Sequence, residues 1–362
     1  MSKKAIYIAS TRELSGKSVV TVALASIAKD LGKNVGYFKP IGLEYTTDEK
    51  GEPLDEDAET MRRILNLKDE LSLVCPFVVR KDMLLEQISK VGASKVTNKI
   101  KRSFEIASEG KEIILIEGPP ALSVGSFLGC SVPKLAADFH AEILLVERFE
   151  DDLVVDDVLQ ARDYCMKWKA NLQGVILNQV PPAKMLKAKN IVKPAFEKNG
   201  VRVVGIIPED RTINALTVKE IHAAIGGKIL AGKDGMEKTV QMVLIGAMTP
   251  ESAIRYFRKA KNELVITGGD RTDIIFAALE AGVSALILTG NLYPSVKIFP
   301  RADDLKVPMI LVPFDTYTTL QMIQRIVGRI KPADKERIDK AKKLVKENVD
   351  WKLILQNGAS SE

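Results

Sequence analysis

The sequence predicts an α/β protein with a mostly parallel sheet covered by helices on both faces, followed by a second, smaller α/β domain. Short apolar, β-branched runs alternate with helical patterns through residues 1–210. Continuous rather than alternating apolar strands are typical of a parallel sheet that is buried on both faces. A shorter alternation of the same kind begins at about Thr217. The first strand also leads into a loop that ends in Gly-Lys-Ser and continues as a helix.

The first domain is expected to alternate strand and helix along residues 1–210. The predicted strands are Ala5–Ala9, Val35–Phe38, Ile113–Ile116, Ile143–Val146, Val175–Leu177 and Val203–Ile206. The helical patterns between them are Val19–Leu31, Asp57–Leu65, Ser94–Ala107, Leu153–Trp168 and Met185–Lys198. Several strands end at Gly, Asn or Glu, which places polar groups at the carboxyl edge of the sheet, where ligands bind in open α/β sheets.

The second domain, residues 211–330, repeats this pattern on a smaller scale. Its predicted strands are Val240–Ile245, Leu264–Ile266, Ala285–Leu288 and Met309–Val312, and its helices are Pro250–Lys259, Asp273–Ala281 and Thr318–Ile330. Residues 331–362 are expected to form a charged helix over Lys331–Trp351 and a frayed polar end, Asn357–Glu362. The helix carries i,i+4 pairs such as Glu336–Lys340.

Composition excludes several classes of function. The net charge of +6 is spread over 362 residues without a Lys/Arg block that is interleaved with aromatics, so no nucleic-acid partner is expected. No apolar run of about 18 residues occurs, and the amino-terminal run is too short for a signal peptide. The chain has only two histidines, which excludes a multi-histidine metal site. Its three cysteines have no metal-ligand spacing and indicate a reducing compartment. We therefore expect a cytoplasmic protein.

The loop between the first strand and the first helix is a candidate phosphate-binding loop. A loop of this kind binds an anion through consecutive backbone N–H groups and a helix amino end. Gly16 allows close approach, Lys17 supplies positive charge, and the Ser18 hydroxyl is placed to ligate Mg²⁺. Thr11 stands where the usual motif has its first glycine. The predicted cofactor-binding residues of the loop are Thr11, Ser15, Gly16, Lys17, Ser18 and Val19. The alternative is a surface Gly-Lys-Ser before an ordinary helix.

Two acids are candidate magnesium ligands beside Ser18, because Mg²⁺ takes oxygen ligands. Glu117 ends the strand Ile113–Ile116, at the carboxyl edge of the sheet. Its alternative is a solvated strand end. Asp57 belongs to an acidic cluster that opens a helix, and the helix macrodipole alone would favour acids there.

Two further polar residues end predicted strands. Lys39, which precedes Pro40, could hold a transferred phosphoryl group or a substrate carboxylate, and with Lys17 it is a candidate catalytic residue. Its alternative is an ordinary solvent lysine. Asn178 could bind a purine edge, or it could be a turn asparagine.

Together these segments resemble the dethiobiotin synthetase-like ATPases over about residues 1–208. That family has Thr at the position of Thr11. The resemblance implies that Lys17 binds phosphates, that Ser18, Asp57 and Glu117 hold Mg²⁺, that Asn178 contacts the base and that Lys39 faces the substrate. Two segments that line the diamino acid pocket of the family depart from its pattern. They are Glu13-Leu14-Ser15, in place of Thr-Glu-Val, and Gly118-Pro119-Pro120-Ala121, in place of Gly-Ala-Gly-Gly.

The second domain carries a sequence that resembles the signature of the DRTGG domain. Its two glycines would let the backbone approach an anionic ligand, and Asp270 or Thr272 could cap the following helix. The possible second ligand site comprises Gly268, Gly269, Asp270, Arg271 and Thr272. The alternative is a tight turn without a ligand. Both domains together resemble the amino-terminal regulatory half of long phosphate acetyltransferases. We expect neither an acetyltransferase nor a glutamine amidotransferase domain, because the chain ends soon after Ile330 and no cysteine follows Cys165.

Two functions of different classes follow from these resemblances. The first is a regulatory or interaction protein that binds ATP, or another nucleoside triphosphate, with Mg²⁺ and acts on a metabolic enzyme as its partner. The alternative is an ATP-dependent carboxylate–amine ligase of the dethiobiotin synthetase type, or a weak ATPase, in which Lys17 and Lys39 act on the phosphoryl group. A third possibility is a degenerate scaffold that binds nothing. Self-association into a homo-oligomer is expected, because relatives form oligomers.

Overall fold

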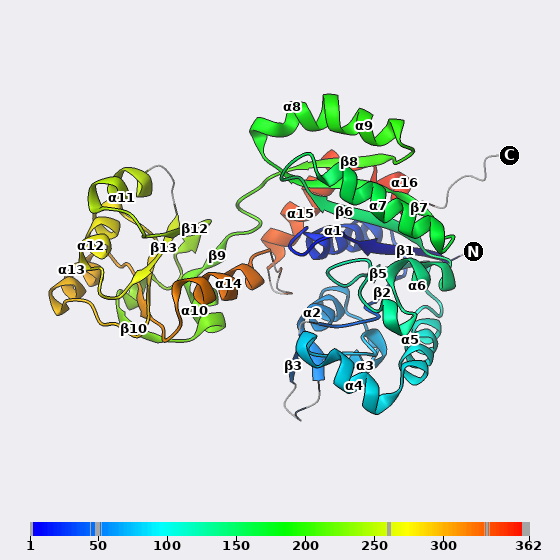
Figure 1. Ribbon diagram of the computed structural model, residues 1–362, viewed down its shortest axis with the longest axis horizontal. Helices are drawn as coiled ribbons and strands as arrows, with labels where there is room; N and C mark the ends of the chain where they lie inside the picture. The colour runs from blue at the N-terminus through cyan, green and yellow to red at the C-terminus, as the bar shows by residue number, and fades with distance from the viewer. Residues whose placement is uncertain are drawn as a thin grey trace. The chain divides into compact units, whose positions relative to one another are not determined.

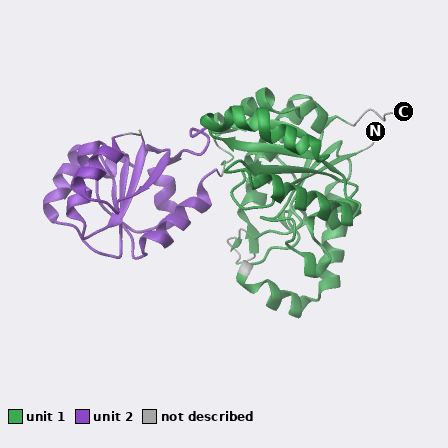
Figure 2. Ribbon diagram, turned by 45° about the horizontal axis from the view of Figure 1, so that its top comes forward, with its two compact units in different colours: residues 1–209, 330–362 green, residues 210–329 purple. Residues whose placement is uncertain are grey.

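The chain forms two compact units (Figure 2). Unit 1 comprises residues 1–209 and 330–362, and unit 2 comprises residues 210–329. The computed structural model describes residues 3–43, 45–47, 51, 53–258, 262–328, 330, 332 and 334–356, without the side chain of Lys81. The predicted helix end at Lys259, the helix start at Lys331 and the polar end Asn357–Glu362 lie outside the described residues.

Unit 1 is built on a six-stranded sheet with the strand order β2-β5-β1-β6-β7-β8, in which every neighbouring pair is parallel. The strands are β1 (Lys4–Ala9), β2 (Val35–Phe38), β5 (Ile113–Glu117), β6 (Glu142–Arg148), β7 (Leu172–Val180) and β8 (Val203–Pro208). The predicted parallel sheet is confirmed (Figure 1). Its central strand β1 leads into the candidate phosphate loop, so β5 and β6 on either side bring their carboxyl ends to that loop.

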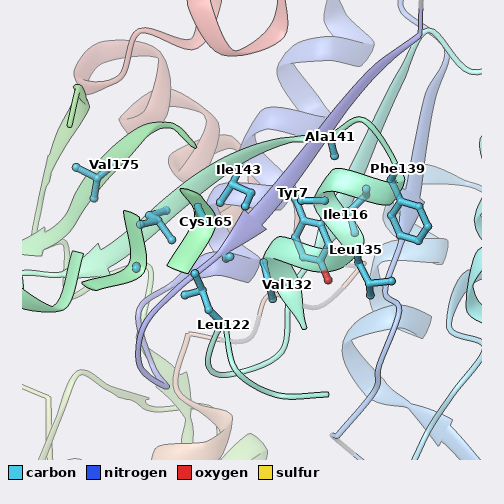
Figure 3. Packing of buried hydrophobic residues seen from close by; sticks show 14 of the residues in the cluster. Tyr7, Ile116, Leu122, Val132, Leu135, Phe139, Ala141, Ile143, Cys165 and Val175 are labelled. Atoms are coloured by element: carbon cyan, nitrogen blue, oxygen red, sulfur yellow. The ribbon is translucent and has the colours of Figure 1, made fainter. Parts of the chain in front are cut away.

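Helices cover both faces of this sheet. The main helices before unit 2 are α1 (Lys17–Asp30), α2 (Glu56–Leu65), α4 (Leu84–Val91), α5 (Ala93–Ala107), α6 (Val132–Asp138) and α7 (Val154–Lys167). Tyr7 of β1 packs in a cluster with Phe139 and Leu135, on one face (Figure 3). Ile6 and Ile8 alternate with Tyr7 and are also fully buried, so the opposite face is covered too.

The predicted helix Met185–Lys198 is interrupted by a wider turn. It consists of α8 (Met185–Lys187), a π-helical segment (Ala188–Val192) and α9 (Lys193–Lys198). Pro194 lacks a backbone N–H and cannot continue an α-helical hydrogen-bond ladder, which accounts for the local change of pitch.

Two secondary features of unit 1 lie outside the main alternation. A hairpin of β3 (Tyr45–Thr47) and β4 (Pro53–Asp55) leads directly into α2. The short helix α3 (Leu71–Val74) follows α2, and the backbone N–H of Lys39 donates to the carbonyl oxygen of Val74, 2.8 Å away. These segments therefore enclose the end of β2.

After unit 2 the chain returns to unit 1. Helix α15 (Lys335–Asn348) contacts α1, and the short helix α16 (Trp351–Leu355) follows it (Figure 1). Lys342 of α15 pairs with Asp30 at the end of α1, with Nζ 2.7 Å from Oδ2. The backbone N–H of Asp350 donates to the carbonyl oxygen of Val204 in β8, at 2.8 Å. The predicted i,i+4 pair Glu336–Lys340 is present at 2.8 Å.

Unit 2 has a five-stranded sheet with the order β10-β15-β14-β13-β12, which is parallel except for β10. The strands are β10 (Lys228–Ala231), β12 (Met242–Ile245), β13 (Glu263–Gly268), β14 (Ala285–Thr289) and β15 (Met309–Leu311). The helices are α10 (Val218–Ile225), α11 (Pro250–Phe257), α12 (Thr272–Ala281), α13 (Phe299–Asp304) and α14 (Thr316–Ile326). One apolar cluster joins the sheet to α11, α12 and α13, and a second joins it to α10 and α14.

Three details of unit 2 differ from the prediction. The predicted strand Val240–Ile245 is two strands, because β11 (Thr239–Val240) pairs with β9 (Leu216–Thr217) while β12 joins the main sheet. The antiparallel strand β10 was not predicted. Helix α14 starts earlier than expected, because the side chain of Asp315 accepts a hydrogen bond from the backbone N–H of Thr318 and caps it.

In the described part of the chain, no helix is both long enough and apolar enough to cross a bilayer.

Candidate functional site

The loop of residues 10–16 joins β1 to α1, and Gly16 makes its last turn. Gly16 has a left-handed backbone with φ 86°, which favours glycine. A Cβ atom at Gly16 would lie 2.2 Å from Nδ2 of Asn178, closer than any real contact. Asn178 of β7 donates from Nδ2 to the carbonyl oxygen of Ser15, 2.8 Å away. The turn therefore needs glycine both for its backbone and for the close approach of Asn178.

Lys17 is the first residue of α1, and its side chain returns over the loop. Its Nζ donates to Oγ of Ser10, 2.7 Å away. Burial lowers the pKa of Lys17, and the carboxylates of Glu117 and Glu147 oppose that effect. The loop thus holds a partly buried positive charge close to two acids.

Ser18, Glu117 and Tyr37 form a hydrogen-bonded row across β5. The Ser18 hydroxyl donates to Oε1 of Glu117 at 2.7 Å, and the Tyr37 hydroxyl donates to Oε2 at 3.1 Å. Glu117 is 2% exposed. Burial raises the pKa of Glu117, although Lys39 nearby opposes the shift. A hydroxyl and a carboxylate oxygen side by side are ligands of the kind that Mg²⁺ prefers.

Lys39 ends β2 and lies between two carboxylates. It is 4% exposed, and its Nζ is 2.7 Å from Oδ1 of Asp55 and 3.0 Å from Oδ2 of Asp57. Burial by itself would lower the pKa of Lys39, but Asp57 and Asp55 raise it well above its usual value. Asp55 also accepts the backbone N–H of Ala58, and so it caps α2. The side chain of Lys39 is thus buried and ion-paired rather than solvated.

The site fits a magnesium ion only in combination with other oxygen ligands. Among the described residues, no group of three or more His, Cys, Asp and Glu side chains could hold a metal ion by itself. Mg²⁺ is commonly held by one or two carboxylates together with phosphate oxygens and water. Ser18 and Glu117 are adjacent and have the required chemistry, whereas Asp57 is engaged with Lys39.

Three residues beside the loop were missed by the sequence interpretation: Tyr37, Asp55 and Glu147. Glu147 lies in β6, one residue before the strand ends. It is 2% exposed and accepts two hydrogen bonds from Thr11, one from the backbone N–H at 2.7 Å and one from Oγ1 at 2.8 Å. The rule that selected Glu117, an acid following a buried strand, applies equally to Glu147 after Ile143–Val146.

A small pocket borders the same part of the loop. Its lining includes Arg12, Ser15, Glu147, Arg148 and Asp157. Arg12 pairs with Asp157 of α7, with Nη2 2.7 Å from Oδ2. The Ser15 hydroxyl is buried and has no hydrogen-bond partner among the described residues. A ligand at the loop could therefore satisfy Ser15.

The glycine turn of unit 2 is explained by contacts within its own chain. A Cβ atom at Gly269 would lie 1.6 Å from the carbonyl oxygen of Leu292, and one at Gly268 would lie 2.6 Å from Oδ1 of Asp270. Helix α12 starts at Thr272 without a side-chain hydrogen bond at its cap, so neither Asp270 nor Thr272 caps it as expected. The Arg271 guanidinium bonds Asp273 and the carbonyl oxygen of Met248. A ligand at this turn stays a prediction.

Sequence comparisons agree with this architecture. A phosphate acetyltransferase of Synechocystis sp. is 24% identical over 367 residues, which cover 97% of this chain and 51% of the relative. An ATP-dependent dethiobiotin synthetase of Nitrosopumilus maritimus is 25% identical over 207 residues, which cover 57% of this chain and 89% of the relative. The chain spans about half the length of the phosphate acetyltransferases that it matches.

One solved structure aligns with part of this chain. The septum site-determining protein MinD of Pyrococcus horikoshii, determined with Mg-ADP, aligns with a TM-score of 0.40 and 17% identity. The alignment covers 59% of this chain and 84% of that chain. Residues 4–217 match the family described as AAA domain, and residues 220–326 match the DRTGG domain. The chain therefore belongs to the AAA domain family, with a P-loop nucleotide-binding domain that is followed by a DRTGG domain.

Proposed function

We propose that this chain binds ATP, or another nucleoside triphosphate, together with Mg²⁺ at the loop of residues 10–18, and that it acts as a regulatory or interaction protein. The observation that carries the proposal is the 2.7 Å contact between the Ser18 hydroxyl and the buried carboxylate of Glu117. It lies at the amino end of α1, where backbone N–H groups and the helix dipole favour an anion. Membership of the AAA domain family supports the same assignment.

Each part of the loop has a task in this proposal. The turn at Gly16 brings backbone N–H groups toward the phosphates, and Lys17 neutralises charge on the outer phosphates. Ser18 and Glu117 would hold the Mg²⁺ ion, which supplies positive charge to the β- and γ-phosphate oxygens when it is bound. Asn178 holds the loop through Ser15, and in the proposal it lies beside the base.

The regulatory role rests on how the chain relates to longer proteins. Its matches to phosphate acetyltransferases cover nearly all of this chain but only about half of those relatives. Lys39, the second candidate catalytic lysine, has its ammonium group bound by Asp55 and Asp57. In a regulatory protein the nucleotide must bind two states of the chain with different affinity, and a partner metabolic enzyme must respond to that difference.

A ligase of the dethiobiotin synthetase type is the second candidate function. It is favoured by the relative from Nitrosopumilus maritimus, 89% of which is covered by the alignment. In such an enzyme ATP would phosphorylate a carboxylate, and an amine would then displace phosphate. Positioning and electrostatic stabilisation by Lys17 and Mg²⁺ would supply the catalysis.

Titration calorimetry with ATP and GTP, in Mg²⁺ and in EDTA, tests the binding. Lys17→Ala should lose about tenfold or more in affinity, because a charge-assisted hydrogen bond is lost. Lys29→Ala, at the other end of α1, is the matched control and should bind as the unchanged protein does. Failure of the unchanged protein to bind either nucleotide would refute the proposal.

Phosphate release separates the two functions. The protein is incubated with ATP alone and with a pool of short diamines and dicarboxylates. Turnover that requires such a substrate and is lost in Lys17→Ala would establish the ligase. Nucleotide binding that changes hydrogen exchange in unit 2, without turnover, would support the regulatory role.

A further inference from the structure

Glu147 places a buried carboxylate against Thr11, near the start of the phosphate loop. Its Oε1 accepts the backbone N–H of Thr11 at 2.7 Å, and its Oε2 accepts the Thr11 hydroxyl at 2.8 Å. Both carboxylate oxygens of Glu147 thus accept hydrogen bonds from Thr11, and these bonds link the loop to β6. This is unusual chemistry for a loop that should receive phosphate, because an ionised carboxylate and a phosphate repel each other.

The charged groups around Glu147 come from each neighbouring element. Lys17 of α1 favours the ionised form of the carboxyl, and Asp157 of α7 disfavours it. Asp157 is partly neutralised by Arg12 of the loop, with which it pairs at 2.7 Å. Arg148, next to Glu147 on β6, pairs with Glu150 at 3.2 Å. The remaining charged residues that line the pocket are Glu13 and Asp151.

Burial has a larger effect on the pKa of Glu147 than any of these charged groups. It raises the pKa of Glu147 to about 7, against the opposing hydrogen bonds from Thr11. The carboxyl therefore exists in both protonation states near neutral pH. A protonated carboxyl can keep both contacts, because its carbonyl oxygen still accepts the Thr11 N–H and its hydroxyl can donate to Oγ1 of Thr11. Protonation removes the charge without releasing the loop.

We propose that Glu147 is a positioning residue of the phosphate loop that takes up one proton from solvent when the loop binds a nucleotide. The proton neutralises the carboxylate that would otherwise face the phosphates, while Thr11 stays in place. The inference rests on the proposed nucleotide binding. It adds that nucleotide affinity falls as the pH rises above neutrality, because the ionised protein must first gain a proton.

The test is calorimetry of Mg-ATP binding between about pH 6.5 and about pH 8.5, in buffers with different ionisation enthalpies. The unchanged protein should take up close to one proton per nucleotide at the upper end. Its dissociation constant should rise by up to about tenfold per pH unit there. Glu147→Gln keeps the two contacts without the charge, so its affinity should change with pH only as far as the nucleotide and Lys17 themselves titrate.

A matched control and a structural variant distinguish the effect of protonating Glu147 from the effect of its contacts with Thr11. Glu142→Gln makes the same change at the other end of β6, where Glu142 pairs with Lys4 at 2.7 Å, and it should keep the pH dependence of the unchanged protein. Glu147→Ala removes both contacts as well as the charge, so it should bind more weakly than Glu147→Gln by a similar factor across the whole pH range.

The possible outcomes are distinct. Binding by the unchanged protein without proton uptake would overturn the inference and leave the proposed function standing, and this measurement needs no variant to fold. Equal proton uptake in Glu147→Gln would also overturn it. Absence of nucleotide binding in every form of the protein would overturn the proposed function and the inference together.

Discussion

The turn at Gly16 makes a quantitative prediction for Gly16→Ala. The substitution places a Cβ atom 2.2 Å from Nδ2 of Asn178 on a backbone with φ 86°. The left-handed backbone costs a non-glycine residue about 1 kcal/mol. Displacing Asn178 breaks its hydrogen bond to the carbonyl oxygen of Ser15 and leaves a buried polar group unsatisfied, which costs about 1–3 kcal/mol. Together, unit 1 should lose about 2–4 kcal/mol of unfolding free energy.

Gly32→Ala is the matched control for this prediction. Gly32 follows the same helix, has φ 72° and would meet no atom within 4 Å of its new Cβ. It should cost only the backbone strain of about 1 kcal/mol. Replacing glycine by alanine also lowers the conformational entropy of the unfolded chain, which raises the unfolding free energy. This gain is common to the two substitutions, so it cancels in the comparison.

Tryptophan emission during urea unfolding measures the effect in unit 1 alone. The chain has two tryptophans, Trp168 and Trp351, and both belong to unit 1. The emission transition therefore reports that unit even when unit 2 unfolds separately.

A double-mutant cycle with Asn178→Ala identifies the cause. Once the Asn178 side chain is truncated, the added Cβ at Gly16 meets less resistance, so Gly16→Ala should then cost about as much as Gly32→Ala. Equal losses for Gly16→Ala and Gly32→Ala in the unchanged background would refute the argument from close approach.

Three further predictions follow from the buried charges at the site. Lys39→Met should destabilise unit 1 by about 3–5 kcal/mol in urea, because it leaves the fully buried Asp55 without its ammonium partner. Tyr37→Phe should weaken the Mg²⁺-dependent part of nucleotide binding by about tenfold in calorimetry, because Glu117 loses an orienting donor. The pKa of Glu147 is raised by burial to about 7 from 4.5, so its protonated form stabilises the fold. Unit 1 should therefore lose about 3 kcal/mol of unfolding free energy as the pH rises from 4.5 to 7, and Glu147→Gln should remove that loss.

Each of these has a control and a contrary result. Lys198→Met alters an exposed lysine of α9 and should leave stability within about 0.5 kcal/mol; a similar effect of Lys39→Met would count against the buried pair. Tyr164→Phe alters a hydroxyl that contacts Ser126, and it should not change the Mg²⁺ dependence. An unchanged slope of stability against pH in Glu147→Gln would show that other groups account for it.

The parallel sheets were predictable because each strand is a short, continuous apolar run that burial on both faces requires. The same reasoning failed for the edge strand β10, Lys228–Ala231. Its residues before Ala231 are exposed or half-buried, so the strand lacks a continuous buried run. The same reasoning also merged β11 and β12 into one predicted strand, because Gln241 is a single polar residue within the otherwise apolar run Val240–Ile245 and shows no turn signal. Period and composition do not reveal which sheet a strand joins.

Within the candidate site, contacts that are local in sequence or follow the motif could be anticipated. Gly16, Lys17 and Ser18 lie at the start of a helix as the motif requires, and Glu117 reaches Ser18 because β5 is the neighbour of β1. The pairing of Lys39 with Asp55 depends on the β3–β4 hairpin, which carries no apolar signal. No sequence pattern states that a strand-end lysine will be buried between two acids.

Unit 1 is assembled from two stretches of chain that are separated by the whole of unit 2, and this constrains the order of events during synthesis. Unit 2 is continuous in sequence, so all of its residues have been made before the second stretch of unit 1 is translated. The face of α1 that contacts α15 stays uncovered until residues 335–348 have been made. At roughly 5–20 residues per second, the intervening 120 residues, 210–329, take on the order of ten seconds to translate. During that interval the helix that carries the phosphate loop lacks its outer neighbour, so a nascent chain would acquire a complete nucleotide-binding unit only after its second domain already exists.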